Sequence, residues 1–214
     1  MAKVGIIGAG SWGTALSLLL YKNGNQVTVW SALEDEIAML EAEHEQKDKL
    51  PGVKLPEDMI FTTDLESAVR EKEVLVLAVP SPFVRSTAAR MAPFVEQGQI
   101  LVNVAKGIEE KTLMTLSQIL EQEIPAAEIA VLSGPSHAEE VGRGIPTTIV
   151  VGTQRKETAE RLQNLFMNEV FRVYTSSDVP GIELGAALKN VVALAAGIAD
   201  GLGYGDNTKA ALIT

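Results

Sequence analysis

The chain has 214 residues, 46% of them hydrophobic, so it is long and apolar enough to bury one substantial core. Its 28 acidic and 18 basic side chains give a formal charge of −10, which argues against nucleic acid or an anionic membrane surface as a partner, because both would be repelled. Cysteine is absent, which excludes disulfides, thiolate metal sites and a cysteine nucleophile. We expect no metal, and any anionic ligand must be held by a few local positive features.

Short apolar runs predict strands at 4–7, 27–30, 74–79, 100–104, 129–132, 147–151 and 171–174. Helical patterns lie between them, at 14–23, 34–45, 83–94, 112–121 and 156–166. Ser31 and Glu34 have the S/T-x-x-E spacing of a capped helix start. Most of the strands are continuous apolar runs, which is typical of parallel strands covered on both faces. The alternation predicts an α/β fold with a doubly wound parallel sheet.

The segment between Lys3 and Lys22 carries no charge over 18 residues, as a signal sequence or a membrane span would. Four glycines lie among its first ten residues, and each costs about 1 kcal/mol relative to alanine inside a helix. We therefore expect a strand, a tight turn and then a helix here, and no membrane span in the chain.

The pattern changes after Pro180. Residues 182–199 form an alanine- and leucine-rich helical stretch, and no strand is predicted after it. We divide the chain into a strand-and-helix domain at 1–179 and the first part of a helical domain at 180–214. The chain stops within an apolar stretch that has no capping glycine, so we expect this second domain to be truncated.

The first predicted strand leads into Gly8-Ala9-Gly10-Ser11-Trp12-Gly13, a complete G-x-G-x-x-G motif. In this motif the first glycine allows the tight turn, the second lets a pyrophosphate approach the backbone, and the third lets the helix pack closely. The free amides and the positive dipole end of the following helix then hold the diphosphate. The motif has the strand–turn–helix context that it requires, and it predicts a Rossmann-type dinucleotide-binding domain.

The choice between NAD and NADP is made near the end of the second strand, about 20 residues further on. That point has Trp30-Ser31-Ala32-Leu33, with no carboxylate for a ribose 2′-hydroxyl and no basic side chain for a 2′-phosphate. Ser31 could bind either group or cap the helix. The nearby Glu34, Asp35 and Glu36 would disfavour a 2′-phosphate electrostatically. The preference between NAD and NADP therefore stays open.

Three further loops follow predicted strands, at 80–83, 105–107 and 133–136. Ligands of doubly wound sheets bind beyond the carboxyl ends of the strands. We therefore expect these loops to form one cleft with the glycine motif, and Lys106 is the cation in that cleft.

Lys189 lies in a helical stretch that is otherwise poor in charge, 186–192. It is either a lysine that extends to solvent from a packed helix or a functional group. Burial makes a lysine easier to deprotonate, and such a lysine can give a proton to a carbonyl oxygen as a hydride arrives. The two histidines, His44 and His137, lie beside glutamates and are interpreted as surface residues.

Five motifs together resemble the bacterial NAD(P)-dependent glycerol-3-phosphate dehydrogenase family over the whole chain: 8–16, Val79-Pro80-Ser81, 105–109, Ser133-Gly134-Pro135-Ser136 and Leu188-Lys189-Asn190-Val191. The resemblance implies reversible reduction of dihydroxyacetone phosphate, a small phosphorylated three-carbon substrate, to sn-glycerol 3-phosphate for phospholipid synthesis. It also implies a helical second domain, a cytoplasmic location and a homodimer in the full-length protein.

The resemblance also assigns residues. Lys189 takes the acid/base role, and the substrate site is lined by Lys106, Gly134, Ser136 and Lys189. The dinucleotide, NAD or NADP, contacts Gly8, Gly10, Ser11, Trp12, Gly13, Phe83, Lys106 and Ala138.

Two departures from the family pattern bear on these expectations. Many members have a basic or imidazole side chain where this chain has Ala32, which weakens the case for NADP. Members also continue beyond Thr214 with residues that complete the phosphate pocket, so we expect the 214-residue chain by itself to bind dinucleotide but to turn over slowly or not at all. A related β-hydroxyacid or nucleotide-sugar dehydrogenase and a noncatalytic dinucleotide-binding module stay open as alternatives.

Overall fold

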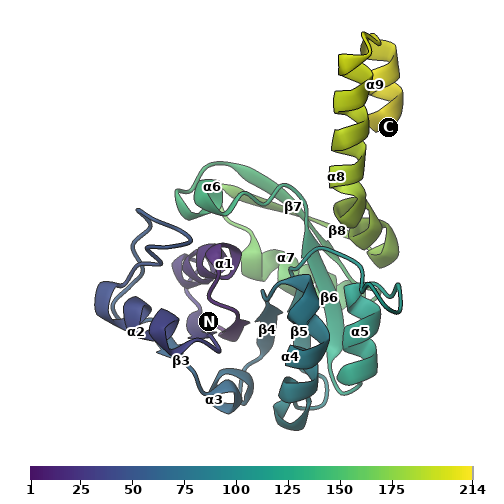
Figure 1. Cartoon of the computed structure of the whole chain (residues 1–214). Coiled ribbons are helices and arrows are strands. Elements are labelled where there is room, and N and C mark those ends of the chain that lie inside the picture. Colours follow the sequence, from purple (N-terminus) through teal and green to yellow (C-terminus); the bar gives the residue numbers. More distant parts are fainter. Residues whose placement is uncertain (214) are drawn as a thin grey trace.

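A computed structural model of the chain describes residues 1–213 (Figure 1). One eight-stranded sheet has the strand order β3-β2-β1-β4-β5-β6-β7-β8. The strands are β1 (Lys3–Ile7), β2 (Gln26–Trp30), β3 (Ile60–Thr62), β4 (Val74–Leu77), β5 (Ile100–Asn103), β6 (Glu128–Ser133), β7 (Thr147–Gly152) and β8 (Phe171–Ser176). The helices are α1 (Ser11–Lys22), α2 (Glu34–Glu43), α3 (Leu65–Val69), α4 (Val84–Met91), α5 (Leu116–Glu123), α6 (Ala138–Gly142), α7 (Lys156–Phe166), α8 (Val179–Gly201) and α9 (Asp206–Ile213), with short 3₁₀ turns at Ser81–Phe83 and Ala92–Phe94.

The central strands are buried on both faces because successive side chains point to opposite sides of the sheet. In β4, Val74 and Val76 join the core under α1, α6 and α7, whereas Leu75 and Leu77 join the core under α3, α4 and α5. This explains why the strands are continuous apolar runs rather than alternating ones. The predicted α/β class and doubly wound sheet are confirmed.

Two features of the sheet differ from the prediction. Strand β7 runs antiparallel to β6, whereas every other neighbouring pair is parallel. A parallel pairing needs a connection that crosses back along the sheet, but the segment between β6 and β7 contains only the short α6, which packs against α1. Strand β3 was also missed, because its three residues are too few to give a periodic pattern.

The last two described helices stand apart from the sheet. Helix α8 packs its first turns near β6 and β7 and then projects away, and α9 folds back alongside it (Figure 1). Only Glu183 and Ala199 of α8 are buried, and large apolar side chains are exposed along the rest of the helix. Among the helices of residues 1–213, α8 alone is long and apolar enough to cross a membrane, by length and composition only. Helix α8 begins at Val179, so the domain boundary predicted between residues 179 and 180 falls in its first turn. The division into two domains stays a prediction.

Candidate active site

The glycine-rich turn connects β1 to α1 with the geometry that its sequence predicts. Gly8 has φ +121°, and a Cβ there would lie 2.8 Å from the backbone carbonyl carbon of Ala78. At Gly13 a Cβ would lie 1.9 Å from the Gly8 carbonyl oxygen, so only glycine allows this close packing of helix on turn. A Cβ at Gly10 would meet nothing within 4 Å. The backbone at Gly10 therefore faces open space, as a pyrophosphate site requires.

The amino-terminal end of α1 opens onto a cavity of about 830 Å³. Gly10 is the N-cap, so no side chain satisfies the first amides of the helix. These amides and the helix dipole favour an anion. Among the described residues, the buried Nε1 of Trp12 also has no hydrogen-bond partner. The free amides, the open space at Gly10 and the unpaired indole nitrogen fit a dinucleotide diphosphate.

Most of the predicted dinucleotide residues line this cavity: Gly8, Gly10, Ser11, Trp12, Phe83 and Lys106. Gly13 lies behind the turn, where it supports the geometry. Ala138 is buried in the core at the start of α6 and lines neither this cavity nor the next one, so its contact with dinucleotide stays a prediction.

Among the polar residues of this cavity wall, Ser31 was left undecided, Glu36 was expected only to disfavour a 2′-phosphate by its charge, and Lys49 and Arg90 were missed. Ser31 was weighed as a helix cap, but the N-cap of α2 is Leu33, and the Ser31 hydroxyl instead donates to Glu36. Arg90 reaches the wall from α4 and lies over the Trp30 ring, 5.3 Å from its centre. No local sequence signal points to Lys49 or Arg90, because they reach the wall through tertiary packing.

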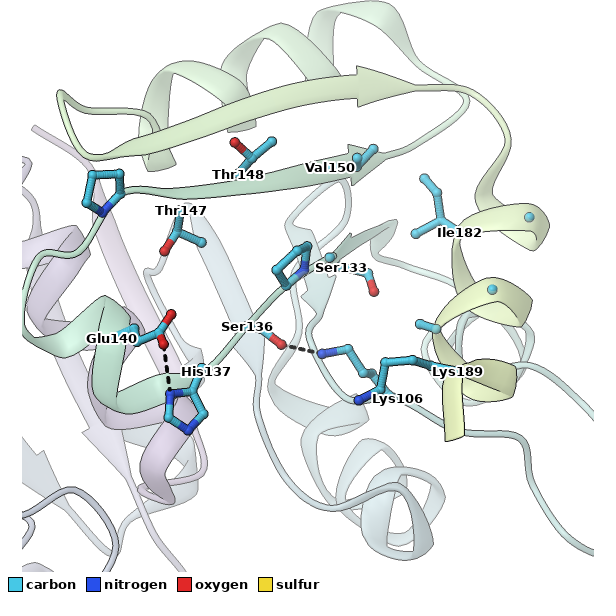
Figure 2. A pocket seen from close by; sticks show the side chains of 16 residues that line it. Lys106, Ser133, Ser136, His137, Glu140, Thr147, Thr148, Val150, Ile182 and Lys189 are labelled. Carbon is cyan, nitrogen blue, oxygen red and sulfur yellow. Dashed lines mark hydrogen bonds and ion pairs between the residues drawn. The ribbon is translucent and has the colours of Figure 1, made fainter. Parts of the chain in front are cut away.

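A second cavity, of about 1010 Å³, lies between β6, β7 and α8 (Figure 2). The four predicted substrate residues, Lys106, Gly134, Ser136 and Lys189, all line it. His137 also lines this cavity and is exposed, as predicted. Its Nε2 lies 3.2 Å from a Glu139 carboxylate oxygen, and its Nδ1 lies 3.7 Å from one of Glu140. Three segments distant in sequence thus converge on one cavity.

The two lysines face the same space in this cavity. Lys106 donates a hydrogen bond to the Ser136 hydroxyl, and Lys189 extends from α8 toward them (Figure 2). Desolvation lowers the pKa of Lys106, and the positive charge of Lys189 lowers that pKa further. Of the two interpretations weighed for Lys189, the structure shows the exposed one, because its side chain lies exposed on α8. The physical reason is that α8 leaves the sheet domain after its first turns. The acid/base role of Lys189 stays a prediction.

Backbone geometry fixes the loops that carry Lys106 and Ser136. Gly107 has φ +141°, and Gly134 has φ +147°. A Cβ at Gly107 would lie 2.9 Å from the Ser81 hydroxyl oxygen, so the loops after β4 and β5 approach one another closely. The three loops do gather at the carboxyl ends of the strands, but the single predicted cleft is divided: the loops after β4 and β5 line the cavity of the glycine turn, the loop after β6 lines the second cavity, and Lys106 lines both.

An ion-pair network holds the loop that follows Lys106. Arg85 on α4 donates to both carboxylate oxygens of Glu109, each at 2.7 Å, and to Glu123 on α5 at 2.5 Å. Hydrogen bonds from Arg85 and Thr112 lower the pKa of Glu109 to about 2. A bidentate guanidinium–carboxylate pair of this kind fixes geometry as well as charge.

One buried contact attaches α8 to the sheet domain. Glu183 accepts hydrogen bonds from the Ser117 backbone amide at 2.9 Å and from its hydroxyl at 2.5 Å. Ser117 lies in the first turn of α5, where a carboxylate is favoured by the helix dipole. Since Glu183 and Lys189 belong to the same helix, this contact also sets where Lys189 lies. No group of three or more metal-ligating side chains occurs within residues 1–213.

Comparisons with known proteins agree with this geometry. The family model for the NAD-dependent glycerol-3-phosphate dehydrogenase N-terminus matches residues 3–159, and that for the C-terminus matches residues 178–214. Proteins named glycerol-3-phosphate dehydrogenase [NAD(P)+] are 68% identical in Agathobacter rectalis and 56% identical in Fusobacterium nucleatum, each over the whole of this chain. The chain spans 64% of the length of both relatives.

Solved structures give the same result. The glycerol-3-phosphate dehydrogenase of Coxiella burnetii is 33% identical, with a TM-score of 0.88 over 99% of this chain and 65% of that one. Neighbours below 25% identity include a ketopantoate reductase from Ralstonia eutropha (TM-score 0.67, 89% of this chain, 60% of that one) and show only the shared fold. The chain belongs to the NAD-dependent glycerol-3-phosphate dehydrogenase family.

Proposed function

We propose that this protein is an oxidoreductase that reversibly reduces dihydroxyacetone phosphate to sn-glycerol 3-phosphate, with NADH or NADPH as the reductant. This reaction supplies the backbone of glycerophospholipids. Membership of the family and the names of the relatives support the proposal. We further propose, from the family resemblance, that the protein acts in the cytoplasm as a homodimer.

The observation that carries the proposal is that the two cavities meet at Lys106, which lines both. A dinucleotide with its diphosphate at Gly10 would extend toward Lys106. A small substrate in the second cavity would lie beside Lys106, Ser136 and Lys189. Hydride transfer needs such a meeting of two ligands, because reacting atoms must come within about 3–3.5 Å of each other.

The residues of the second cavity suit a phosphorylated ketone. In a protein with a formal charge of −10, Lys106 and Lys189 provide the positive charge that a phosphate needs there. Bound reduced nicotinamide would supply the hydride. The Lys189 ammonium would give a proton to the carbonyl oxygen and take it back in the reverse direction. The same charge would stabilise the developing alkoxide.

Substrate profiling tests the reaction. The full-length protein is offered dihydroxyacetone phosphate or dihydroxyacetone with the reduced dinucleotide, and a β-hydroxyacid or a nucleotide sugar with the oxidised one, and the absorbance of the reduced nicotinamide is followed. We expect turnover only with the phosphorylated three-carbon pair. Turnover with the β-hydroxyacid or the nucleotide sugar, and none with dihydroxyacetone phosphate, would overturn the proposal in favour of a related dehydrogenase. Dinucleotide binding without turnover of any of them would favour a noncatalytic module.

A further inference from the structure

A carboxylate reaches the end of β2 in the structure, although the sequence places none there. Glu36 lies in the first turn of α2 and is 8% exposed. Its Oε2 accepts a hydrogen bond of 2.5 Å from the hydroxyl of Ser31, the residue directly after β2. Both side chains line the cavity that contains Gly8 and Gly10.

Two more side chains fix the Glu36 carboxylate. Gln46 is fully buried, and its amide nitrogen donates to Glu36 Oε1 at 2.8 Å and to the Ala9 carbonyl at 2.9 Å. Lys49 Nζ lies 2.5 Å from the same Oε1. The carboxylate is therefore held between the end of β2 and the glycine-rich turn. In doubly wound folds the adenosine ribose of a dinucleotide lies at this place.

The hydrogen-bond directions decide which group this corner can accept. The single hydroxyl proton of Ser31 is donated to Glu36, so Ser31 can only accept further hydrogen bonds. One of its lone pairs takes the Leu33 amide at 3.2 Å, and one is left. A ribose 2′-hydroxyl can donate to that lone pair. A 2′-phosphate at neutral pH is mostly doubly ionised and has no proton to donate.

The surrounding charge also disfavours a 2′-phosphate. The surface hollow next to this corner is lined by Glu34, Asp35, Glu36 and Asp48, and its one cation is Lys49. The Lys49 charge is already paired with Glu36. Arg90, also on the cavity wall, lies over the Trp30 ring. Arg90 keeps its charge there, but the four carboxylates outnumber Lys49 and Arg90, so a phosphate placed here would meet an excess of negative charge.

We propose that Glu36, acting through Ser31, makes this site select NAD, with its free 2′-hydroxyl, over the 2′-phosphorylated NADP. The inference rests on the proposed function in one respect, that a dinucleotide occupies the cavity. Glu36 is a positioning residue and Ser31 is the group that contacts the ribose.

The dissociation constants of NADH and NADPH test this, measured by titration of the reduced-nicotinamide fluorescence with the protein. We expect NADH to bind at least about tenfold more tightly, since one hydrogen bond gained and one charge repulsion avoided each contribute on the order of a factor of ten. Glu36→Gln keeps the shape and removes the charge, and we expect the NADPH/NADH ratio of dissociation constants to fall about tenfold. Glu41→Gln removes the same charge from an exposed position of α2 that lines neither hollow, and it should leave the ratio within about twofold, because exposed charges are screened.

Ser31→Ala gives an independent readout that does not disturb a charge. We expect it to weaken NADH several-fold and to leave NADPH nearly unchanged. Equal or tighter binding of NADPH by the unaltered protein, or an unchanged ratio in both Glu36→Gln and Ser31→Ala, would overturn the inference and leave the proposed reaction standing. Failure of both dinucleotides to bind would overturn the proposed function and this inference together.

Discussion

The two cavities are built in different ways. The cavity at the start of α1, where we propose that the dinucleotide binds, is called the dinucleotide cavity. It depends on the backbone of one short turn, in which Gly8, Gly10 and Gly13 set the shape within six residues. The second cavity depends on side chains from segments far apart, with Lys106 after β5 and Lys189 on α8. The first site therefore follows from local conformational rules, whereas the second exists only when α8 is correctly placed on the sheet domain.

The largest effect is expected at Lys189. In the full-length protein, Lys189→Met removes the proposed proton donor and should lower kcat by about 10²–10⁴-fold, the usual contribution of a general acid. Because Lys189 does not line the dinucleotide cavity, the dissociation constant of NADH should stay unchanged. Steady-state kinetics and a fluorescence titration measure the two quantities.

Lys156→Met is the matched control, since its side chain is 84% exposed and pairs only with Glu160 in the described structure. Its kcat should be that of the unaltered protein. Unchanged turnover in Lys189→Met would remove this residue from the mechanism.

The next effect is expected at Gly10. Its φ of −68° suits alanine, and the added methyl group would fill only the open space that the diphosphate needs. Gly10→Ala should therefore leave the melting temperature nearly unchanged and weaken NADH by at least about tenfold, or 1.4 kcal/mol.

Gly197→Ala on α8 is the control, because a Cβ there also meets nothing within 4 Å. Alanine is favoured over glycine in a helix by up to about 1 kcal/mol, so this variant should be slightly more stable and bind NADH normally. Normal binding by Gly10→Ala would show that the diphosphate does not lie at this turn.

An effect of comparable size, on stability instead of on binding, is expected where α8 meets α5. Glu183→Ala leaves the buried Ser117 amide without its acceptor, which should lower the free energy of unfolding by about 1–3 kcal/mol. It should also lower kcat, because Lys189 loses its fixed position, while NADH binding is kept. Glu183→Gln retains an acceptor oxygen and should restore part of kcat. An equal loss of NADH binding and kcat in Glu183→Ala would mean general unfolding instead of misplacement of α8.

The smallest effect is expected at Glu109 and depends on pH. Its pKa is lowered from 4.5 to about 2 in the folded state, so its stabilising contribution is present above about pH 4.5 and is lost as the pH falls to about 2. The difference in melting temperature between the unaltered protein and Glu109→Gln should shrink over that range. A difference that stays constant across it would contradict the proposed pairing with Arg85.

The sequence predicted the strands well, because both faces of each central strand are buried and the apolar runs are continuous. It failed where distant segments decide the outcome. The antiparallel β7 follows from the packing of α6 on α1, which no local pattern encodes. The sequence left open whether Ser31 binds the ligand or caps the helix, because the Glu36 carboxylate reaches Ser31 only once α2 has folded.

The features of the candidate site also fall into those that the sequence determined and those that the tertiary structure decided. The sequence by itself determined the glycine turn and the residues of the strand-end loops, because turn geometry and strand direction are local consequences of residue type. Only the tertiary structure decided that Lys106 lies in both cavities, that Lys189 is exposed on α8, and that Glu36, Gln46 and Lys49 converge on the end of β2. Contacts between side chains far apart in the chain depend on how the elements pack, and periodicity carries no information about that packing.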